Sequence, residues 1–423
     1  MNDSDALIGR RSVLRGAGIA AAGVVLPGSI ATAAPATTDP DDLFTAGKFA
    51  AADRGYARIL SRDPRNARAL AQRGRIALLS NKFATAERFL TAAIRVNPTD
   101  TFSQRQLAEC FVRQNLAARA VPWFRRTGDQ YDAALATQYG ALRGTPYRIS
   151  GPQRTRVPMF CVDPLPGVQA AMNGRAAENF IMDTGGGILS LTTETAQRLG
   201  LRALATSVSY PAGQTLETSH GILDSFRLGD IVLHDVPVVW FDLRVPRLPD
   251  GTFPAGVIGT ELIQRFLTTM DYAGRGLVLR RKTVGQQQAF RRESAGGDRL
   301  PLWLAGDHIP CTLGSLNGHG PGVVALDTGA IGMGVLTTEQ HALRAGIEID
   351  YAHPIPAGNM TCYRIQPARS KLGSTIGRDL PGLAGAWPWR DLFGFDTLAG
   401  FAHEFFKPYA ITYDYTAMTF TIN

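Results

Sequence analysis

The chain has 423 residues, of which 45% are hydrophobic and 19% are charged, a composition expected of a globular protein with two or three domains. Its formal net charge is +8, but the basic residues are scattered and form no lysine- or arginine-rich block. The charge therefore indicates a solvated surface and argues against a nucleic-acid partner.

Residues 1–36 have the pattern of an export signal. Arg10 and Arg11 precede a mild apolar run over residues 16–26, and small residues close the segment over 31–36. The segment resembles a twin-arginine signal peptide, although Gly9 and Val13 stand where that signal usually has Ser or Thr and Phe. We expect a periplasmic or extracellular protein with no membrane span after signal removal. An uncleaved N-terminal anchor is the second alternative, disfavoured because the apolar run is short and rich in glycine.

The four cysteines form no C-x-x-C pair, and no His/Cys cluster has zinc-ligand spacing, so no metal site is predicted. In an exported chain some of them could pair, but they could equally be buried free thiols. They are Cys110, Cys161, Cys311 and Cys362.

A helical repeat is predicted over residues 40–130. Gly47, Asn81 and Asn115 are spaced 34 residues apart, the period of the tetratricopeptide repeat, which this region resembles. Gly74 falls where that family has a small residue for close helix packing. Two interpretations remain open: a docking surface for a peptide or protein partner, or a helical spacer packed against the next domain. Because each domain has its own repeat, the helices are expected to be separable.

A second repeat organises residues 150–283 and 298–423. An apolar strand ends in Asp183-Thr184-Gly185, and an equivalent strand ends in Asp327-Thr328-Gly329, 144 residues later. A Leu-Thr-Thr-Glu segment and a short helix follow in both copies, and each copy closes on a strand that contains an Asp-Tyr pair. The two halves are therefore predicted to be copies of one mostly β unit, joined by a polar linker over residues 285–298.

The paired D-T-G loops resemble the retropepsin-like and pepsin-like aspartic proteases over roughly residues 155–423. The resemblance implies a multidomain α + β protein: helical tetratricopeptide-like hairpins followed by a two-lobed all-β acid-protease domain with pseudo-two-fold symmetry. It further implies that Asp183 and Asp327 are the catalytic pair. The loops would be supported by Thr184, Gly185, Thr328, Gly329, Gly259 and Gly394, and the flap or substrate-binding candidates are Tyr210, Gly213 and Gly358.

Two adjacent carboxylates would share one proton, so that one activates a water and the other binds the substrate carbonyl, with no metal or cofactor. We therefore expect an exported aspartic endopeptidase acting on polypeptides as a monomer, since both lobes lie in one chain. One alternative is a protein that binds peptide or protein without cutting it, with helical repeats as a docking surface. Another is an enzyme for a non-standard peptide, such as one of the cell wall.

Overall fold

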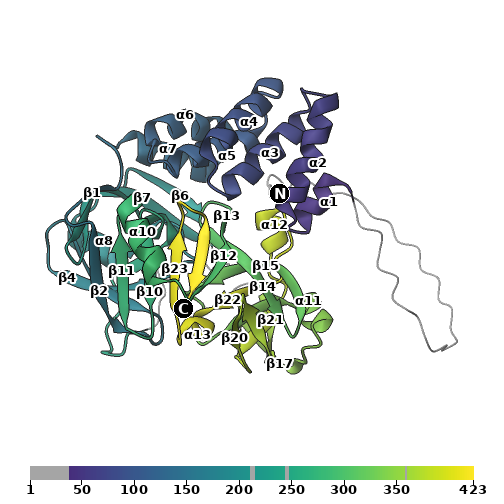
Figure 1. Cartoon of the computed structure of the whole chain (residues 1–423). Helices are drawn as coiled ribbons and strands as arrows, with labels where there is room; N and C mark the ends of the chain where they lie inside the picture. The colour runs from purple at the N-terminus through teal and green to yellow at the C-terminus, as the bar shows by residue number, and fades with distance from the viewer. Residues whose placement is uncertain (1–37, 210–214, 243–246, 358–359) are drawn as a thin grey trace, which may run out of the picture. The chain divides into compact units, whose positions relative to one another are not determined.

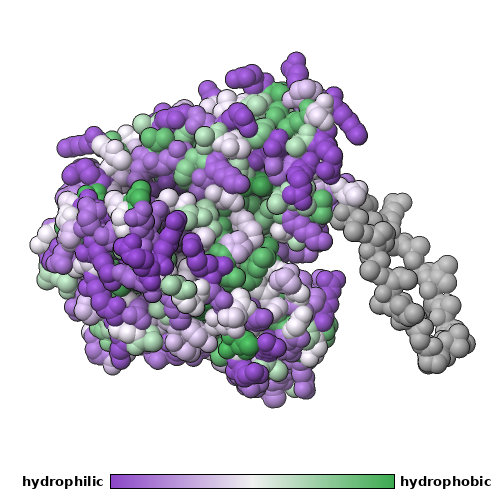
Figure 2. All heavy atoms as spheres, in the orientation of Figure 1, coloured by the Kyte–Doolittle hydropathy of each residue, from purple (hydrophilic) through white to green (hydrophobic). Residues whose placement is uncertain are grey.

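The computed structural model describes residues 38–209, 215–242, 247–357 and 360–423, and residues 38–423 form one compact unit (Figure 1). The predicted export signal and the flap candidates Tyr210, Gly213 and Gly358 lie outside the described residues. Within the described part of the chain, no helix is both long enough and apolar enough to cross a membrane. Hydrophilic residues cover much of the face seen in Figure 2, and hydrophobic residues gather near its centre.

The N-terminal part consists of helical hairpins, as the repeat predicts. Helices α3 and α4 pack so closely that a Cβ atom on Gly74 would lie 2.6 Å from Leu90 Cγ, which explains why a small residue is required there. The seventh helix continues ten residues beyond the expected boundary at 130. The helices are α1 (Pro40–Thr45), α2 (Phe49–Arg62), α3 (Ala67–Leu79), α4 (Phe83–Val96), α5 (Thr101–Val112), α6 (Ala117–Thr127) and α7 (Gln130–Gly140).

The 34-residue period has a backbone cause. Gly47, Asn81 and Asn115 each occupy the turn between two helices, and their φ angles are +71°, +49° and +60°. Glycine and asparagine enter this left-handed region at lower cost than other residues. The repeat is therefore visible in the sequence mainly through its turns, and the structure confirms the tetratricopeptide-like prediction for this region.

The first β lobe runs from residue 148 to 280. Antiparallel pairing of β2 with β3 and of β3 with β4 leads to the strand before Asp183, and β4 pairs in parallel with β9. Its elements are β1 (Arg148–Ser150), β2 (Arg154–Cys161), β3 (Gly167–Met172), β4 (Ala177–Met182), β5 (Leu189–Thr192), α8 (Thr193–Leu199), β6 (Ala205–Ser209), β7 (Leu216–Leu228), β8 (Ile231–Phe241), β9 (Gly256–Ile258), α9 (Thr260–Ile263), β10 (Leu267–Asp271) and β11 (Gly276–Arg280).

The second lobe repeats this plan. Strand β15 ends at Asp327 and pairs in parallel with β22. Its elements are β12 (Asp298–Pro301), β13 (Trp303–Ala305), β14 (Ile309–Leu316), β15 (His319–Asp327), β16 (Val335–Thr338), α11 (Glu339–Arg344), β17 (Ile349–Ala357), β18 (Met360–Ile365), β19 (Ser370–Leu372), β20 (Thr375–Gly377), β21 (Gly382–Gly385), α12 (Trp389–Phe393), β22 (Ala399–Ala402), α13 (His403–Phe406), β23 (Ala410–Asp414) and β24 (Thr419–Ile422).

The matching helices after the two D-T-G strands have matching caps. Thr192 accepts a hydrogen bond from the Thr195 amide at the start of α8, and Thr338 accepts one from the His341 amide at the start of α11. Gly200 and Gly346 follow the two helices with φ of +71° and +62°. Both the duplication and the capping roles predicted from the sequence are thus present.

The closing strands join the lobes. Strand β10 of the first lobe pairs antiparallel with β23 of the second, and the hydroxyls of Thr269 and Thr412 are 2.8 Å apart across this junction. Asp271 and Asp414 accept hydrogen bonds from turn amides, as expected for residues outside the site. The segment predicted to be an irregular linker instead contains helix α10 (Val284–Glu293), started by the cap Thr283.

The helices share a hydrophobic core with the second lobe, which corrects the expectation that they are separable. Phe44 and Phe49 are 3% and 4% exposed, and the Phe49 ring lies 5.0 Å from Phe395 and 5.2 Å from Trp303, centroid to centroid. The Asp396 amide also donates to the Thr45 carbonyl at 2.7 Å. The helices are therefore packed against the next domain, and this packing leaves open whether they also bind a peptide or protein partner.

This shared core predicts that helices and lobes unfold together. Phe49→Ala should lower the free energy of unfolding by about 3–5 kcal/mol, because it removes a buried ring and leaves a cavity. Phe253→Ala, at a position 58% exposed, is the control and should change it by no more than about 0.5 kcal/mol. Urea unfolding is followed by helical circular dichroism and by tryptophan fluorescence. A separate unfolding transition seen by circular dichroism alone, with a midpoint that shifts in Phe49→Ala while the fluorescence midpoint does not, would contradict the shared core.

Candidate active site

The two D-T-G loops meet at the junction of the lobes. Asp183 follows β4 and accepts a hydrogen bond from the Gly185 amide at 2.7 Å, while Asp327 ends β15 and accepts one from the Gly329 amide at 2.8 Å. The side chains of the two aspartates lie close enough for the charge of Asp183 to raise the pKa of Asp327. A Cβ atom on Gly329 would lie 2.3 Å from the Asp183 carboxyl, and one on Gly185 would lie 2.6 Å from that of Asp327. Each carboxyl group therefore lies over the glycine of the opposite loop.

A reciprocal pair of threonines holds the loops in this position. The Thr184 hydroxyl accepts the Thr328 amide and donates to the Leu326 carbonyl, at 3.0 and 2.8 Å. The Thr328 hydroxyl accepts the Thr184 amide and donates to the Met182 carbonyl, at 3.0 and 3.2 Å. Both threonines are fully buried. Four buried backbone groups of the two loops are thus satisfied only when the lobes are in register.

Burial raises the pKa of both carboxyl groups above the usual aspartate range. For Asp327, the charge of Asp183 raises the pKa further. For Asp183, hydrogen bonds from the amides of Gly185 and Gly186 and from Asp327 oppose the effect of burial. The pair therefore holds one proton over an intermediate pH range.

The strand beneath the first loop ends at Gly259. The Thr260 amide donates to the Gly186 carbonyl at 2.8 Å, and the Thr260 hydroxyl donates to the Thr184 carbonyl at 2.9 Å. A Cβ atom on Gly259 would lie 2.2 Å from the Gly187 carbonyl oxygen. Only glycine fits in this position, directly under the loop.

The prediction that Gly394 supports the second loop is wrong. Gly394 ends helix α12 with φ of +68°, and a Cβ atom there would lie 2.7 Å from the Arg75 guanidinium. The strand beneath the second loop is β22, in which Ala402 is opposite Asp327. Two apolar residues followed by glycine also describe a helix end, and this is the structure that residues 392–394 adopt.

Asp183 lines a cavity of about 970 Å3, whose wall comes from both lobes and from the helical domain. Asp183, Gly185 and Gly329 form part of its floor. Helices α3, α5, α6 and α7 contribute to its wall, which was not predicted, because the residues that identify a helical repeat are those that pack its helices together. The helical residues that line it are Arg75, Leu78, Leu79, Phe102, Arg105, Gln106, Glu109, Arg113, Phe124, Tyr131, Leu135 and Tyr139.

A histidine that the sequence analysis did not single out lies against the first loop. His308, in the turn between β13 and β14, is 3.0 Å through Nε2 from the Gly185 carbonyl oxygen, and its Nδ1 contacts the Asp307 carboxylate. Burial alone would lower its pKa, but the charge and hydrogen bond of Asp307, together with Gly185 and Asp183, raise it to about 9. Burial favours the neutral acid at Asp307, yet the charge of His308 holds its pKa below the usual range. The two residues form an ion pair.

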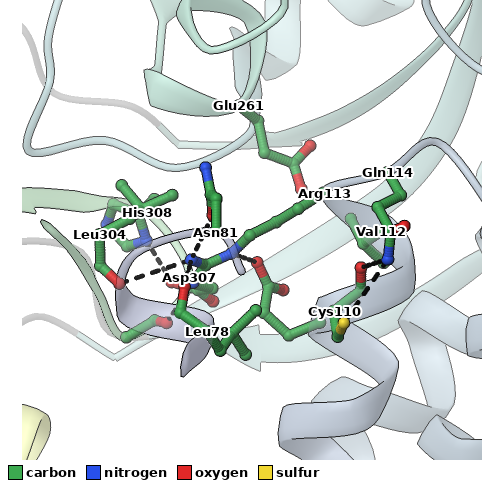
Figure 3. A network of polar contacts seen from close by, with 12 residues as sticks. Leu78, Asn81, Cys110, Val112, Arg113, Gln114, Glu261, Leu304, Asp307 and His308 are labelled. Atoms are coloured by element: carbon green, nitrogen blue, oxygen red, sulfur yellow. Dashed lines mark hydrogen bonds and ion pairs between the residues drawn. The ribbon is translucent and has the colours of Figure 1, made fainter. Parts of the chain in front are cut away.

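Arg113 ties the helical domain to this turn (Figure 3). Its side chain is 1% exposed, and its guanidinium donates to the carbonyls of Gly306 and Leu304 at 2.8 and 3.5 Å. Within the helical domain it pairs with Glu109 at 2.7 Å and reaches Asn81 at 3.3 Å. Burial raises the pKa of Glu109 to about 7, against the lowering effect of Arg113. A buried arginine shared in this way fixes the position of the turn relative to α5.

Gly186 and Gly185 offer a matched test of the loop geometry. A Cβ atom on Gly186 would meet nothing nearer than 3.4 Å, and its φ lies outside the left-handed region. Gly186→Ala should therefore be neutral or should stabilise the fold by about 0.4–1 kcal/mol, since it narrows the unfolded ensemble. Gly185→Ala should destabilise it, because its Cβ would overlap the Asp327 carboxyl. The melting temperatures of both variants are measured beside wild type. A clearly lower melting temperature of Gly186→Ala would show that the loop requires glycine at that position.

Comparison with known proteins places this geometry in context. The model of the family described as aspartyl protease matches residues 168–262, which include Asp183 and Gly259. A search of curated proteins gave no significant match.

Solved structures resemble separate parts of the chain. A retropepsin-like aspartic protease from Rickettsia conorii is 18% identical, covering 32% of this chain and 94% of its own, with a TM-score of 0.23. Basic 7S globulin from soybean is 10% identical, covering 66% and 95%, with a TM-score of 0.37. The TPR2B domain of yeast Sti1, in a complex with pHsp70, is 19% identical, covering 23% and 75%, with a TM-score of 0.21. Because these TM-scores are below 0.5, none of the three bears on function. The family match and the geometry of the lobes together identify an aspartyl protease-like domain in this chain.

Proposed function

We propose that the protein is an aspartic endopeptidase in which Asp183 and Asp327 activate a water molecule against a peptide bond. The observation that carries this proposal is the pair of carboxyl groups, each lying over the glycine of the opposite D-T-G loop, with Asp183 lining a cavity. A structural pair of aspartates would be expected to face basic partners. These two instead face each other, and burial disfavours their charged forms. Such a perturbed pair of carboxyl groups is typical of a catalytic site.

The proposed mechanism needs one ionised and one protonated carboxyl group, and it takes Asp183 as the ionised one. Ionised Asp183 accepts a proton from the water as its oxygen attacks the peptide carbonyl carbon, while protonated Asp327 donates a hydrogen bond to the carbonyl oxygen. The tetrahedral intermediate then collapses: the C–N bond breaks, the leaving nitrogen takes one proton from the pair, and one proton remains shared. The pair thus returns to its starting state, and a carboxyl and an amine terminus are released.

The cavity supports a polypeptide substrate, since it extends from the carboxyl pair to the helical wall and is lined by both apolar and charged side chains. Export to the periplasm or beyond is part of the proposal and rests on the sequence of residues 1–36. The four cysteines are buried free thiols in the structure, so no disulfide contributes to the stability of this domain.

Asp183→Asn and Asp327→Asn should each abolish peptide hydrolysis while leaving the melting temperature within a few degrees of wild type or higher. Each amide removes the shared proton chemistry, so the double variant should be no worse than either single one. Asp271→Asn is the control, because Asp271 is the repeated aspartate outside the site, bound to Arg156 at 3.1 Å. Cleavage of a peptide library is measured by mass spectrometry. Hydrolysis that survives in either dyad variant would contradict the dyad mechanism, whereas a wild-type chain that cleaves no peptide would leave the peptide-binding alternative.

The pH dependence follows from the two raised pKa values. Activity requires one proton on the pair, so it should fall as pH drops through the pKa of Asp183 and fall again as pH rises through that of Asp327. Because burial raises both values, both limbs of the profile of kcat/KM should lie above the ordinary aspartate pKa of about 3.9. A profile that rises without a descending limb would contradict the need for a protonated partner.

A further inference from the structure

The two lobes carry equivalent hairpins that share an aspartate and differ in the residue that follows it. Asp163 lies in the hairpin between β2 and β3, and Asp307 lies in the hairpin between β13 and β14. Each stands 20 residues before the dyad aspartate of its own lobe. In the first lobe the next residue is Pro164, which has no group to protonate, whereas in the second lobe it is His308. In the first lobe, Asp163 instead pairs with Lys407, which follows α13. Only in the second lobe does the hairpin itself carry a titratable side chain next to the aspartate.

His308 lies across the lobe junction, against the loop of Asp183. Its Nε2 is 3.0 Å from the Gly185 carbonyl oxygen, which an N–H at that nitrogen can reach as a donor. Its ring also faces the next part of the loop, where a Cβ atom on Gly187 would lie 3.1 Å from Nδ1. Asp307 contacts Nδ1. Both ring nitrogens therefore face acceptors, which is the arrangement of the doubly protonated ring.

The charged groups around this turn favour a positive His308. Asp307 is the nearest anion, and Asp183 adds to the same effect. Arg105 of α5 is 3.5 Å from the Asp307 carboxylate. Glu109, also on α5, is paired with Arg113, whose guanidinium donates to the Gly306 carbonyl of the turn. The remaining charged groups of the cavity wall are Arg75 of α3 and Glu261 of α9, the latter accepting from Tyr147 at 2.8 Å.

We propose that His308 is a positioning residue that breaks the two-fold symmetry of the aspartate pair, placing the negative charge on Asp183 and the shared proton on Asp327. Two carboxyl groups on equivalent loops have no intrinsic reason to differ. The charge of His308 lowers the pKa of both, but its ring contacts the loop of Asp183, and this one-sided contact supplies a difference. The helical domain takes part because Arg105 and Arg113 hold the turn that carries the cation. This inference rests on the proposed dyad chemistry for its functional meaning, but its electrostatic part can be measured without any substrate.

The test is a pH titration of the full chain carrying 13C-labelled aspartate carboxyl groups, followed by NMR in four proteins. His308→Gln keeps a side chain that can donate to the Gly185 carbonyl and removes the charge. Asp307→Asn keeps the histidine and removes the anion that holds it protonated. His353→Gln is the matched control, because His353 is exposed on β17 and pairs only locally with Asp350 at 2.9 Å. The dyad resonances are assigned by their loss in Asp183→Asn and Asp327→Asn.

In wild type, the Asp183 resonance should titrate at the lower pH of the two. His308→Gln should raise that lower pKa by roughly one unit and narrow the gap to the second, since a nearby cation no longer favours the ionised form. Asp307→Asn should shift it in the same direction, and His353→Gln should match wild type. In hydrolysis assays the acid limb of the kcat/KM profile should move upward by the same amount.

The outcomes separate the two claims. Unchanged aspartate pKa values in both His308→Gln and Asp307→Asn, or Asp327 titrating first in wild type, would overturn the proposed role of His308. If the wild-type chain shows no hydrolysis while the aspartate titration behaves as expected, the endopeptidase proposal fails and the electrostatic inference stands. If His308→Gln does not fold, the Asp307→Asn titration decides alone.

Discussion

The structure depends on one constraint, the crossed hydrogen bonding of Thr184 and Thr328 between the two lobes. Each buried hydroxyl accepts an amide of the opposite loop and donates to a carbonyl of the opposite strand, so neither loop is satisfied without the other. This bracing brings Asp183 and Asp327 together although both would be better hydrated apart. Their mutual repulsion is then relieved by sharing one proton, which is the state from which a water can be activated. The antiparallel pairing of β10 with β23 also holds the two lobes in a fixed position relative to each other.

The helical domain is bound to this centre through polar contacts as well as the shared core. Arg113 reaches two carbonyls of the second lobe, and Arg265 of the first lobe reaches the carbonyls of Val112 and Arg113 at the end of α5. These buried guanidinium groups have lost their hydration and donate instead to backbone carbonyls, including those at the end of α5. If α5 moved, the guanidinium groups would be buried without these acceptors, so the contacts hold the helix in place. The helices therefore wall the cavity and also fix the turn of His308. The helical repeat thus forms part of the cavity wall.

Short sequence motifs predicted local structure well where only one backbone conformation suits them. They failed where the same motif occurs in more than one kind of structure. The D-T-G loops and the left-handed turns of the helical repeat depend on residue types that few conformations tolerate. Gly394 misled because apolar residues followed by glycine also end helices. The interval to the closing strand would have corrected it: Gly259 stands 12 residues before Asp271, and the residue 12 before Asp414 is Ala402, not Gly394. The His308 turn was likewise detectable only through an equal interval in both repeats, and the helical wall of the cavity left no local signal, because long-range packing is not encoded in short motifs.

The most direct test of the account is a crystal structure of the full chain with a peptide that carries a statine-type hydroxyl in place of the scissile bond. Such a group imitates the tetrahedral intermediate, so it should bind where the developing charge is stabilised. The account predicts that this hydroxyl lies within hydrogen-bond distance of both Asp183 and Asp327, with the peptide extending along the helical wall of the cavity. A peptide bound away from both carboxyl groups, or bound identically by Asp183→Asn and wild type in calorimetry, would contradict a catalytic pair.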